Sequence, residues 1–285
     1  QAEDGIRDLV RSRGLGDVYK RQVVNGLLYT GEETQSIEIM RNFPLNTTII
    51  PDEKYISNAL VTLRNQYGEI DTLNYWPRNR CYALVYDPME IVGGEEYTLY
   101  VSAEIDGQEL WTRSSTIAPY PGFSINDQLS TSGTITYRKY YVDGKLTDPT
   151  VTFNRTAGAE FYGLSAVALN ANDSTFIEDN IFGFKPDSLQ EVIDYAKHIS
   201  YWSSPDNSAD GSSTIDLPWY LIYFYSTYRL TIYAGDLNFY HFYISHQSVM
   251  NMDGNLREPL FHFEGDGIGL FGSAIRDSIF FEVIQ

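Results

Sequence analysis

The stretch Glu258-Pro-Leu-Phe-His-Phe-Glu-Gly-Asp-Gly-Ile-Gly-Leu-Phe-Gly272 decides which fold class the chain can adopt. It contains a literal GxGxxG pattern at Gly267, Gly269 and Gly272. In a dinucleotide-binding fold this pattern opens a helix inside a βαβ unit, with an acidic residue about 20 positions later. Here the residues that follow, 277–284, read as a strand. We therefore predict that these glycines, together with Gly265, serve turns with positive φ or close backbone packing.

Short strand patterns fill the chain between residues 23 and 117. Apolar and polar residues alternate in runs such as 35–41, 59–64 and 97–105, which is typical of strands with one buried face. Asp106-Gly107 predicts a two-residue hairpin turn, because a type I′ turn needs positive φ at both central positions. About seven short strands at this spacing predict an immunoglobulin-like β-sandwich over 23–117.

The second half of the chain also predicts an antiparallel β domain, so the fold class is all-β. The segment 118–123 contains two prolines and a glycine and is the expected linker. We expect a larger, aromatic-rich β domain over 124–285, with a hairpin turn at Asp143-Gly144 and strands at 220–225, 228–234 and 239–245. One inserted helix is predicted over 188–198, where Ser188 and Glu191 have the spacing of a capping box.

The first segment of the chain, residues 1–22, resembles a translated sequencing-adapter artefact. Such segments are excluded from fold reasoning, so the first expected domain begins at residue 23. The alternative interpretation is a genuine N-terminal helix. On the artefact interpretation, the natural start of the gene precedes Val23 and is not represented in this sequence.

The charge balance excludes one class of function. The chain has 38 acidic and 20 basic residues and a net charge of −18, and such a surface repels nucleic-acid phosphates and anionic membranes. Solubility or cation binding is the expected consequence of this charge. The longest apolar run, 217–225, is too short to cross a bilayer as a helix. Cys81 is the single cysteine, and we expect it to pack in the core rather than act as a nucleophile.

Metal and catalytic motifs give no strong prediction. His241 and His246 lie on a predicted strand and its end, and five residues apart they would face opposite sides. Asp206 and Asp210 lie in a polar loop with alternate oxygens, but the loop lacks the final glutamate of an EF-hand, so an ordinary solvated loop is the alternative. We expect no catalytic residue, cofactor or metal. Pairs among the many carboxylates leave a glycoside hydrolase open.

Exposed aromatic side chains are the predicted ligand contacts. Trp202 borders the polar loop 203–213, and Trp219 with Tyr220 begins an aromatic run. Aromatic rings can stack on apolar ligand faces, and loops carry function more often than strands do. Core packing is the alternative for each residue. If Trp202 is a contact, Trp202→Ala should weaken ligand binding without unfolding the protein.

Taken together, these segments resemble one protein family. The residues that carry the resemblance are 23–28, 59–63, Gly68, 93–101 and the block from Phe239 through Glu258-Pro259 to Gly272. The chain is similar over nearly all of 23–285 to domain of unknown function 4249, found in cell-envelope lipoproteins of Bacteroidota. The resemblance implies export, a lipid-anchored cysteine before Val23, and genes beside TonB-dependent outer-membrane transporters. It implies no known catalytic residues.

The expected function follows from this resemblance. We expect a noncatalytic lipoprotein of the outer membrane that binds a ligand or partner and assists a TonB-dependent transporter. Its ligand would be a glycan, a peptide or another small molecule, and nucleic acid is excluded. The alternatives are a surface adhesin or structural module, in which the sandwich acts only as a spacer, and a glycan hydrolase.

Overall fold

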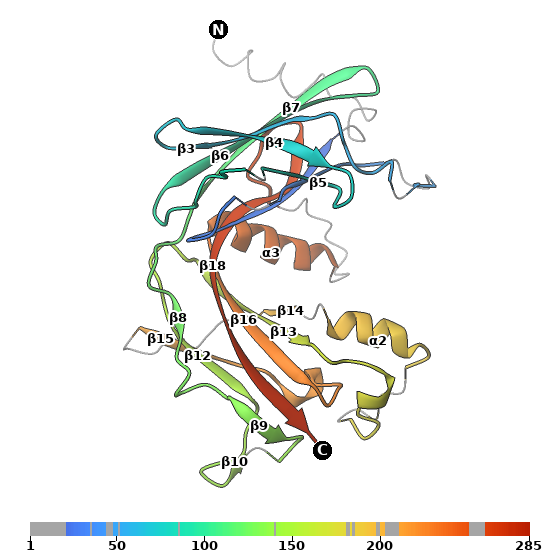
Figure 1. Ribbon diagram of the computed structural model, residues 1–285, viewed down its shortest axis with the longest axis vertical. Helices are drawn as coiled ribbons and strands as arrows, with labels where there is room; N and C mark the ends of the chain where they lie inside the picture. Colours follow the sequence, from blue (N-terminus) through green and yellow to red (C-terminus); the bar gives the residue numbers. More distant parts are fainter. Residues whose placement is uncertain are drawn as a thin grey trace. The chain divides into compact units, whose positions relative to one another are not determined.

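Figure 1 shows a computed structural model of the chain. The structure describes residues 21–34, 36–43, 48–50, 52–84, 86–139, 141–180, 183, 186–197, 200–202, 211–250 and 260–285. Two compact units are present: unit 1 consists of Gln1–Ala118 and Asp236–Ser273, and unit 2 consists of Pro119–Gly235 and Ala274–Gln285. Strands dominate both units, which confirms the predicted all-β class.

Unit 1 is a β-sandwich with one helix. One sheet has the strand order β17-β7-β6-β3-β4-β5, and β1, β2 and the first part of β18 are paired in another sheet. Buried side chains from both sheets form one hydrophobic core. Its elements are β1 (Gln22–Tyr29), β2 (Glu38–Arg41), β3 (Leu60–Asn65), β4 (Ile70–Trp76), β5 (Cys81–Ala83), β6 (Glu96–Ile105), β7 (Gln108–Ile117), α3 (Leu237–Met250), β17 (Glu264–Gly265) and residues 267–273 of β18 (Gly267–Ile284).

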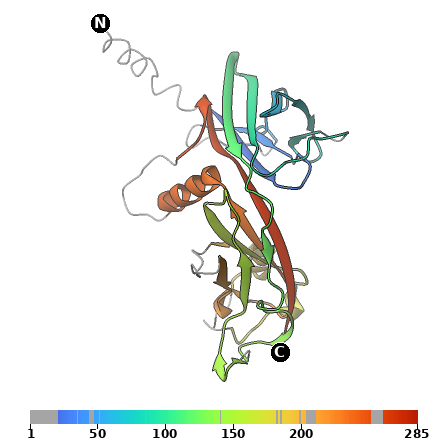
Figure 2. The ribbon, with the colours of Figure 1, turned by 90° about the vertical axis from the view of Figure 1, so that its left-hand side faces the viewer.

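The longest hairpin of unit 1 shows why the sequence folds this way. Along β6, buried and solvent-facing residues alternate, so every second side chain enters the core. Strands β6 and β7 run antiparallel, and Figure 2 shows them side by side. Their turn places Asp106 at φ 52 and Gly107 at φ 76, the positive values that a type I′ turn requires.

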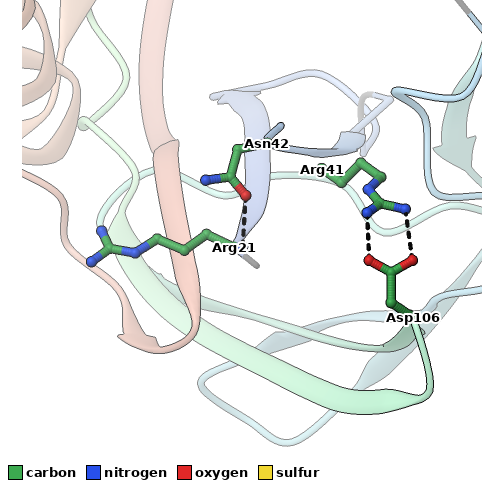
Figure 3. A network of polar contacts seen from close by, with 4 residues as sticks. All are labelled: Arg21, Arg41, Asn42 and Asp106. Atoms are coloured by element: carbon green, nitrogen blue, oxygen red, sulfur yellow. Dashed lines mark hydrogen bonds and ion pairs between the residues drawn. The ribbon is translucent and has the colours of Figure 1, made fainter. Parts of the chain in front are cut away.

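An ion pair connects this turn to β2 (Figure 3). The Arg41 guanidinium donates two hydrogen bonds to the Asp106 carboxylate, with N···O distances of 3.2 and 2.6 Å. Beside it, the backbone N–H of Arg21 donates to Asn42 Oδ1 at 2.7 Å. Both Arg41 and Asp106 are partly exposed, so solvent screening keeps the contribution of this pair to about 0–1 kcal/mol.

Unit 2 has its own core and its own sheets. Strands β14, β13, β16 and the rest of β18 follow one another in one sheet, and β9 pairs with β18 in parallel. The other strands form a sheet of order β15-β12-β8 and the hairpin β10-β11. The elements are β8 (Ser124–Ile125), β9 (Gly133–Thr136), β10 (Tyr141–Val142), β11 (Lys145–Leu146), β12 (Thr150–Asn154), β13 (Phe161–Ala168), α2 (Leu189–Ala196), β14 (Ser200–Trp202), β15 (Ser212–Asp216), β16 (Thr227–Gly235), and 3₁₀ turns at Asp173–Thr175 and Trp219–Leu221.

The predicted inserted helix is present as α2, although its start differs in detail. Ser188 occupies the N-cap position, but its side chain makes no capping hydrogen bond. The helix is held instead by its apolar face, where Val192, Ile193 and Ala196 are buried. The turn Asp143-Gly144 has φ values of 50 and 76, so it takes the predicted hairpin geometry.

Two predicted strands are wrong. Residues 220–225 do not form a strand, since a 3₁₀ turn covers Trp219–Leu221 and only Phe224 makes a β-bridge. Residues 239–245 lie in the helix α3. There the Asp236 carboxylate accepts a hydrogen bond from the N–H of Phe239 at 3.0 Å, which is the contact of an N-cap residue. This cap outweighs the strand propensity of the aromatic residues that follow.

The domain limits also differ from the predicted ones. The chain passes from unit 1 to unit 2 between Ala118 and Pro119, inside the predicted linker. However, 236–273 belongs to unit 1, so the expected domain 124–285 is interrupted. At the other end, Gln22 is fully buried in β1, and its side-chain amide donates to the carbonyl of Leu110 at 3.0 Å. Gln22, the last residue of the segment 1–22, is therefore part of the sheet.

Buried tyrosines secure loops in both units. Tyr82, Tyr97, Tyr162 and Tyr228 are each less than 9% exposed. Each hydroxyl accepts a hydrogen bond from one backbone N–H and donates to a backbone carbonyl of a nearby loop or turn. Such a side chain fills the core with its ring and satisfies loop backbone with its hydroxyl. We call these four residues the loop-anchoring tyrosines.

Candidate functional site

The glycines at 265–272, which do not form a nucleotide motif, allow close backbone packing in unit 1. Gly265 and Gly269 have φ values of 85 and 111, which side chains rarely adopt. A Cβ on Gly267 would lie 1.9 Å from the Thr112 hydroxyl oxygen, and one on Gly272 would lie 2.9 Å from an Asp236 carboxylate oxygen. These glycines let the chain approach β1, β7 and the start of α3 more closely than any side chain would permit.

The aromatic residues predicted as ligand contacts do not form one site. Trp219 is 4% exposed, and its indole N–H donates to the Thr147 carbonyl at 2.9 Å, so its ring is part of the core of unit 2. Tyr220 beside it is 38% exposed. Trp202 ends β14 and its backbone pairs with Gly163, but its side chain lies outside what the structure describes. Trp219 is therefore a core residue, the alternative that the sequence left open, and not an exposed ligand contact.

Asp206 and Asp210 fall outside the described residues. Within the described ranges, no group of three or more histidine, cysteine or acidic side chains is arranged to hold a metal ion. Cys81 is 5% exposed, and burial raises the pKa of its thiol, which favours the inert thiol form and agrees with the expected packing role.

Helix α3 carries His241, which lies beside His262, whereas the strand interpretation compared it with His246. His241 Nδ1 lies 2.8 Å from His262 Nε2, and the two rings are stacked with an interplanar angle of 12°. The pKa of His262 is lowered, mainly by burial and to a smaller extent by the neighbouring His241. Zinc sites take three or four protein ligands, and this pair supplies two. We interpret it as a hydrogen bond that holds segment 260–263 against α3.

A buried carboxylate lies next to this pair in unit 1. Asp236 is 5% exposed and accepts hydrogen bonds from the Thr116 hydroxyl and from the N–H groups of Phe239 and Ser273, at 2.5, 3.0 and 3.1 Å. Burial raises the pKa of Asp236, and the hydrogen bonds from its donors oppose that effect. All its contacts join α3 to β7 and β18, so its role is structural.

A surface hollow of about 690 Å³ in the described part of unit 1 is a candidate for ligand binding. We call it the arginine–tyrosine hollow. It lies between the loop before β3 and the turn that joins β4 to β5. Its lining residues are Asp52, Tyr55, Ser57, Tyr75, Pro77, Arg78 and Arg80. Cationic and aromatic groups therefore meet in a surface depression of an otherwise acidic chain.

Both walls of this hollow are held by the same extended segment, 37–41. The N–H of Arg41 donates to the Lys54 carbonyl at 2.9 Å, and the N–H of Ile56 donates to the Ile39 carbonyl at 2.9 Å. On the other side, Ile37 and Tyr82 exchange two backbone hydrogen bonds of 2.8 and 2.7 Å. Backbone hydrogen bonds to one segment thus hold the loop and the strand β5 that follows the turn, which favours a preformed depression.

Tyr82 joins the two walls through its side chain. Its hydroxyl accepts from the Ala59 N–H at 2.8 Å and donates to the Ile56 carbonyl at 2.9 Å. Its ring packs against Tyr75, with centroids 5.3 Å apart. One buried residue therefore positions both the loop and the aromatic lining of the hollow.

We expect Tyr82→Phe to lower the free energy of unfolding by about 1–3 kcal/mol, because it leaves a buried donor and a buried acceptor without their partner. Urea unfolding followed by circular dichroism measures the change. Tyr75→Phe is the matched control, with an expected change within about 0.5 kcal/mol, because the Tyr75 side chain is only half-buried. Equal losses in the two variants would show that the Tyr82 hydroxyl does not hold the loop.

The conformation of Arg80 is unusual. It has φ 56, a left-handed conformation that costs about 1–2 kcal/mol for a residue with a side chain. Glycine or asparagine would fit this turn position at lower cost. The guanidinium is held in place by the Asp52 carboxylate at 2.6 Å and lies over the Tyr55 ring at 5.4 Å. Strained residues of this kind cluster at functional sites.

Sequence reasoning missed this hollow. The available signal was the turn Pro77-Arg-Asn-Arg80, which places two arginines within four residues of a chain with only 20 basic residues. The facing loop could not be recognised, because its contact with the turn depends on the backbone pairing of segment 37–41 with both walls.

The fold and this hollow define a two-unit, all-β protein with a sandwich in its first unit. A family model described as "Domain of unknown function (DUF4249)" matches residues 17–274, and the chain belongs to this family. The match confirms the predicted resemblance. A comparison with curated proteins gives no significant match. None of the helices that the structure describes has the length and apolar character needed to span a membrane.

Proposed function

We propose that the chain is a noncatalytic, ligand-binding lipoprotein of the bacterial cell envelope, which assists a TonB-dependent outer-membrane transporter. The observation that carries the binding role is the arginine–tyrosine hollow, with two arginines and two tyrosines on backbone held by segment 37–41. Preformed depressions with a few fixed polar groups are typical of ligand sites. The envelope setting, in Bacteroidota, and the transporter are supported by the family resemblance.

The experiment is a pull-down of the natural-length protein from its native outer membrane, analysed by mass spectrometry. A TonB-dependent transporter recovered in stoichiometric amount supports the proposal. Recovery of the protein alone, from a membrane that contains the neighbouring transporters, contradicts it and favours a surface adhesin or a hydrolase. An unrelated lipoprotein from the same membrane, carrying the same tag, is the control for adventitious capture.

The variant Arg80→Gly separates partner binding from ligand binding. If the hollow receives a ligand rather than the transporter, this variant recovers the transporter as the wild type does. Loss of the transporter in this variant would assign the hollow to the protein–protein interface and contradict its assignment as the ligand site.

A further inference from the structure

We infer that the arginine–tyrosine hollow is an oxyanion site, in which Arg78 and Arg80 bind the carboxylate or phosphate group of a small ligand. This inference names the ligand chemistry of the proposed function, and it rests on that function only for the biological role of the ligand. Its first support is the local charge. The residues that line the hollow include two arginines, Arg78 and Arg80, and one carboxylate, Asp52, although the chain as a whole carries −18.

The two arginines have different roles. Arg80 is already paired, because its guanidinium lies 2.6 Å from the Asp52 carboxylate and 5.4 Å from the Tyr55 ring centroid. Arg78 is exposed, and it makes no ion pair with any residue in the described ranges. A guanidinium with a partner is oriented toward the hollow, while one without an ion pair supplies new charge-assisted hydrogen bonds. Guanidinium groups match the planar geometry of carboxylates and the tetrahedral oxygens of phosphates.

The tyrosines also have separate roles. The Tyr55 ring lies within 4.8 Å of the Lys54 ammonium and 5.4 Å of the Arg80 guanidinium, so it positions cations and is not the stacking surface for a ligand. Tyr75 is half-buried and lines the hollow. Its ring and the Ser57 hydroxyl supply the apolar and polar contacts that a ligand larger than an inorganic ion needs.

The left-handed conformation of Arg80 provides a clean test. Arg80→Gly removes the guanidinium and also relieves the positive φ of 56, so the variant should melt at the wild-type temperature or above. Arg78→Gln removes the other cation from an exposed position. Arg113→Gln is the matched control, because Arg113 lines a separate hollow of about 430 Å³ in unit 1, which also contains Arg64.

The measurement is isothermal titration of the purified chain with galacturonate and its short oligomers, with inorganic phosphate, and with neutral galactose. We expect saturable binding of the carboxylate probes, of phosphate, or of both, and weaker binding at higher salt. Arg78→Gln and Arg80→Gly should each weaken that binding by at least about tenfold, while Arg113→Gln should leave it unchanged. Binding of the carboxylates alone identifies an acidic saccharide or organic acid as the ligand class, and binding of phosphate alone identifies a phosphorylated ligand.

Three results overturn the inference: no saturable binding of any anionic probe, equal binding of neutral galactose, or an equal loss in Arg113→Gln. These outcomes are independent of the membrane pull-down. A protein that recovers the transporter but binds no anion retains the proposed function and loses this site. One that binds anions without recovering the transporter retains the site.

Discussion

Replacing Gly269 by alanine should lower the free energy of unfolding by about 3–5 kcal/mol. The added Cβ would lie 2.1 Å from the carbonyl oxygen of Val24. Gly269 also has φ 111, which lies outside the left-handed region that other residues tolerate. Val24 cannot move away independently, because it is paired with Ile39 in β2. Urea unfolding measures the loss directly.

Gly31→Ala is the control for this prediction. Gly31 also has a positive φ, 79, but a Cβ there would meet no atom within 4 Å. Its expected loss is about 1 kcal/mol, from the backbone conformation alone. If Gly269→Ala lost no more than Gly31→Ala, the close approach of β18 to β1 would not be a determinant of stability.

The second large effect is expected for Asp236→Ala, which should destabilise unit 1 by about 3–5 kcal/mol. The change removes the acceptor of three hydrogen bonds, from Thr116, Phe239 and Ser273. It therefore leaves buried donors unsatisfied and removes the N-cap of α3. Thermal and urea unfolding of the variant test the prediction, and a loss below 1 kcal/mol would contradict it.

Asp236→Asn should be far milder, within about 1.5 kcal/mol of the wild type. The amide oxygen can still accept from Phe239 and Ser273, and its NH₂ group can donate to the Thr116 hydroxyl. That hydroxyl in turn lies 2.8 Å from the Ser273 hydroxyl and can donate to it. The comparison of alanine with asparagine therefore separates the loss of hydrogen-bond acceptors from the loss of charge.

The stability difference between the wild type and Asp236→Asn should depend on pH. Burial raises the pKa of Asp236 in the folded state above that in the unfolded state. The folded state then binds the proton more tightly, so this contribution to stability is fully present below the unfolded pKa and is lost as the pH rises through the folded pKa. Relative to Asp236→Asn, the wild type should lose stability as the pH increases from about 4. A constant difference across that range would contradict the buried-carboxylate assignment.

Local sequence rules predict much of this fold. The alternation along 97–105 corresponds to β6, because one face of that strand enters the core. The turns Asp106-Gly107 and Asp143-Gly144 have the geometry that their residue types favour. The glycine block could be separated from a nucleotide motif because the pattern after Gly272 is that of a strand, and β18 extends to Ile284.

The remainder depends on contacts between distant segments. The residues 239–245 have strand-like composition, yet they form a helix because Asp236 caps it and Ser273 supports the cap from another part of the chain. Trp219 resembles an exposed binding residue in the sequence, but the Thr147 carbonyl satisfies its indole and allows burial. The arginine–tyrosine hollow likewise exists only where segment 37–41 pairs with both its walls.

The loop-anchoring tyrosines give the protein a built-in optical reporter of folding. Burial raises the pKa of Tyr82, Tyr97, Tyr162 and Tyr228 above the usual value of a phenol. Near pH 10, unfolded chains therefore contain tyrosinate at positions where folded chains retain phenol. The near-ultraviolet absorbance of tyrosinate should then increase in step with loop release, which would allow unfolding at alkaline pH to be followed in both units without an added dye.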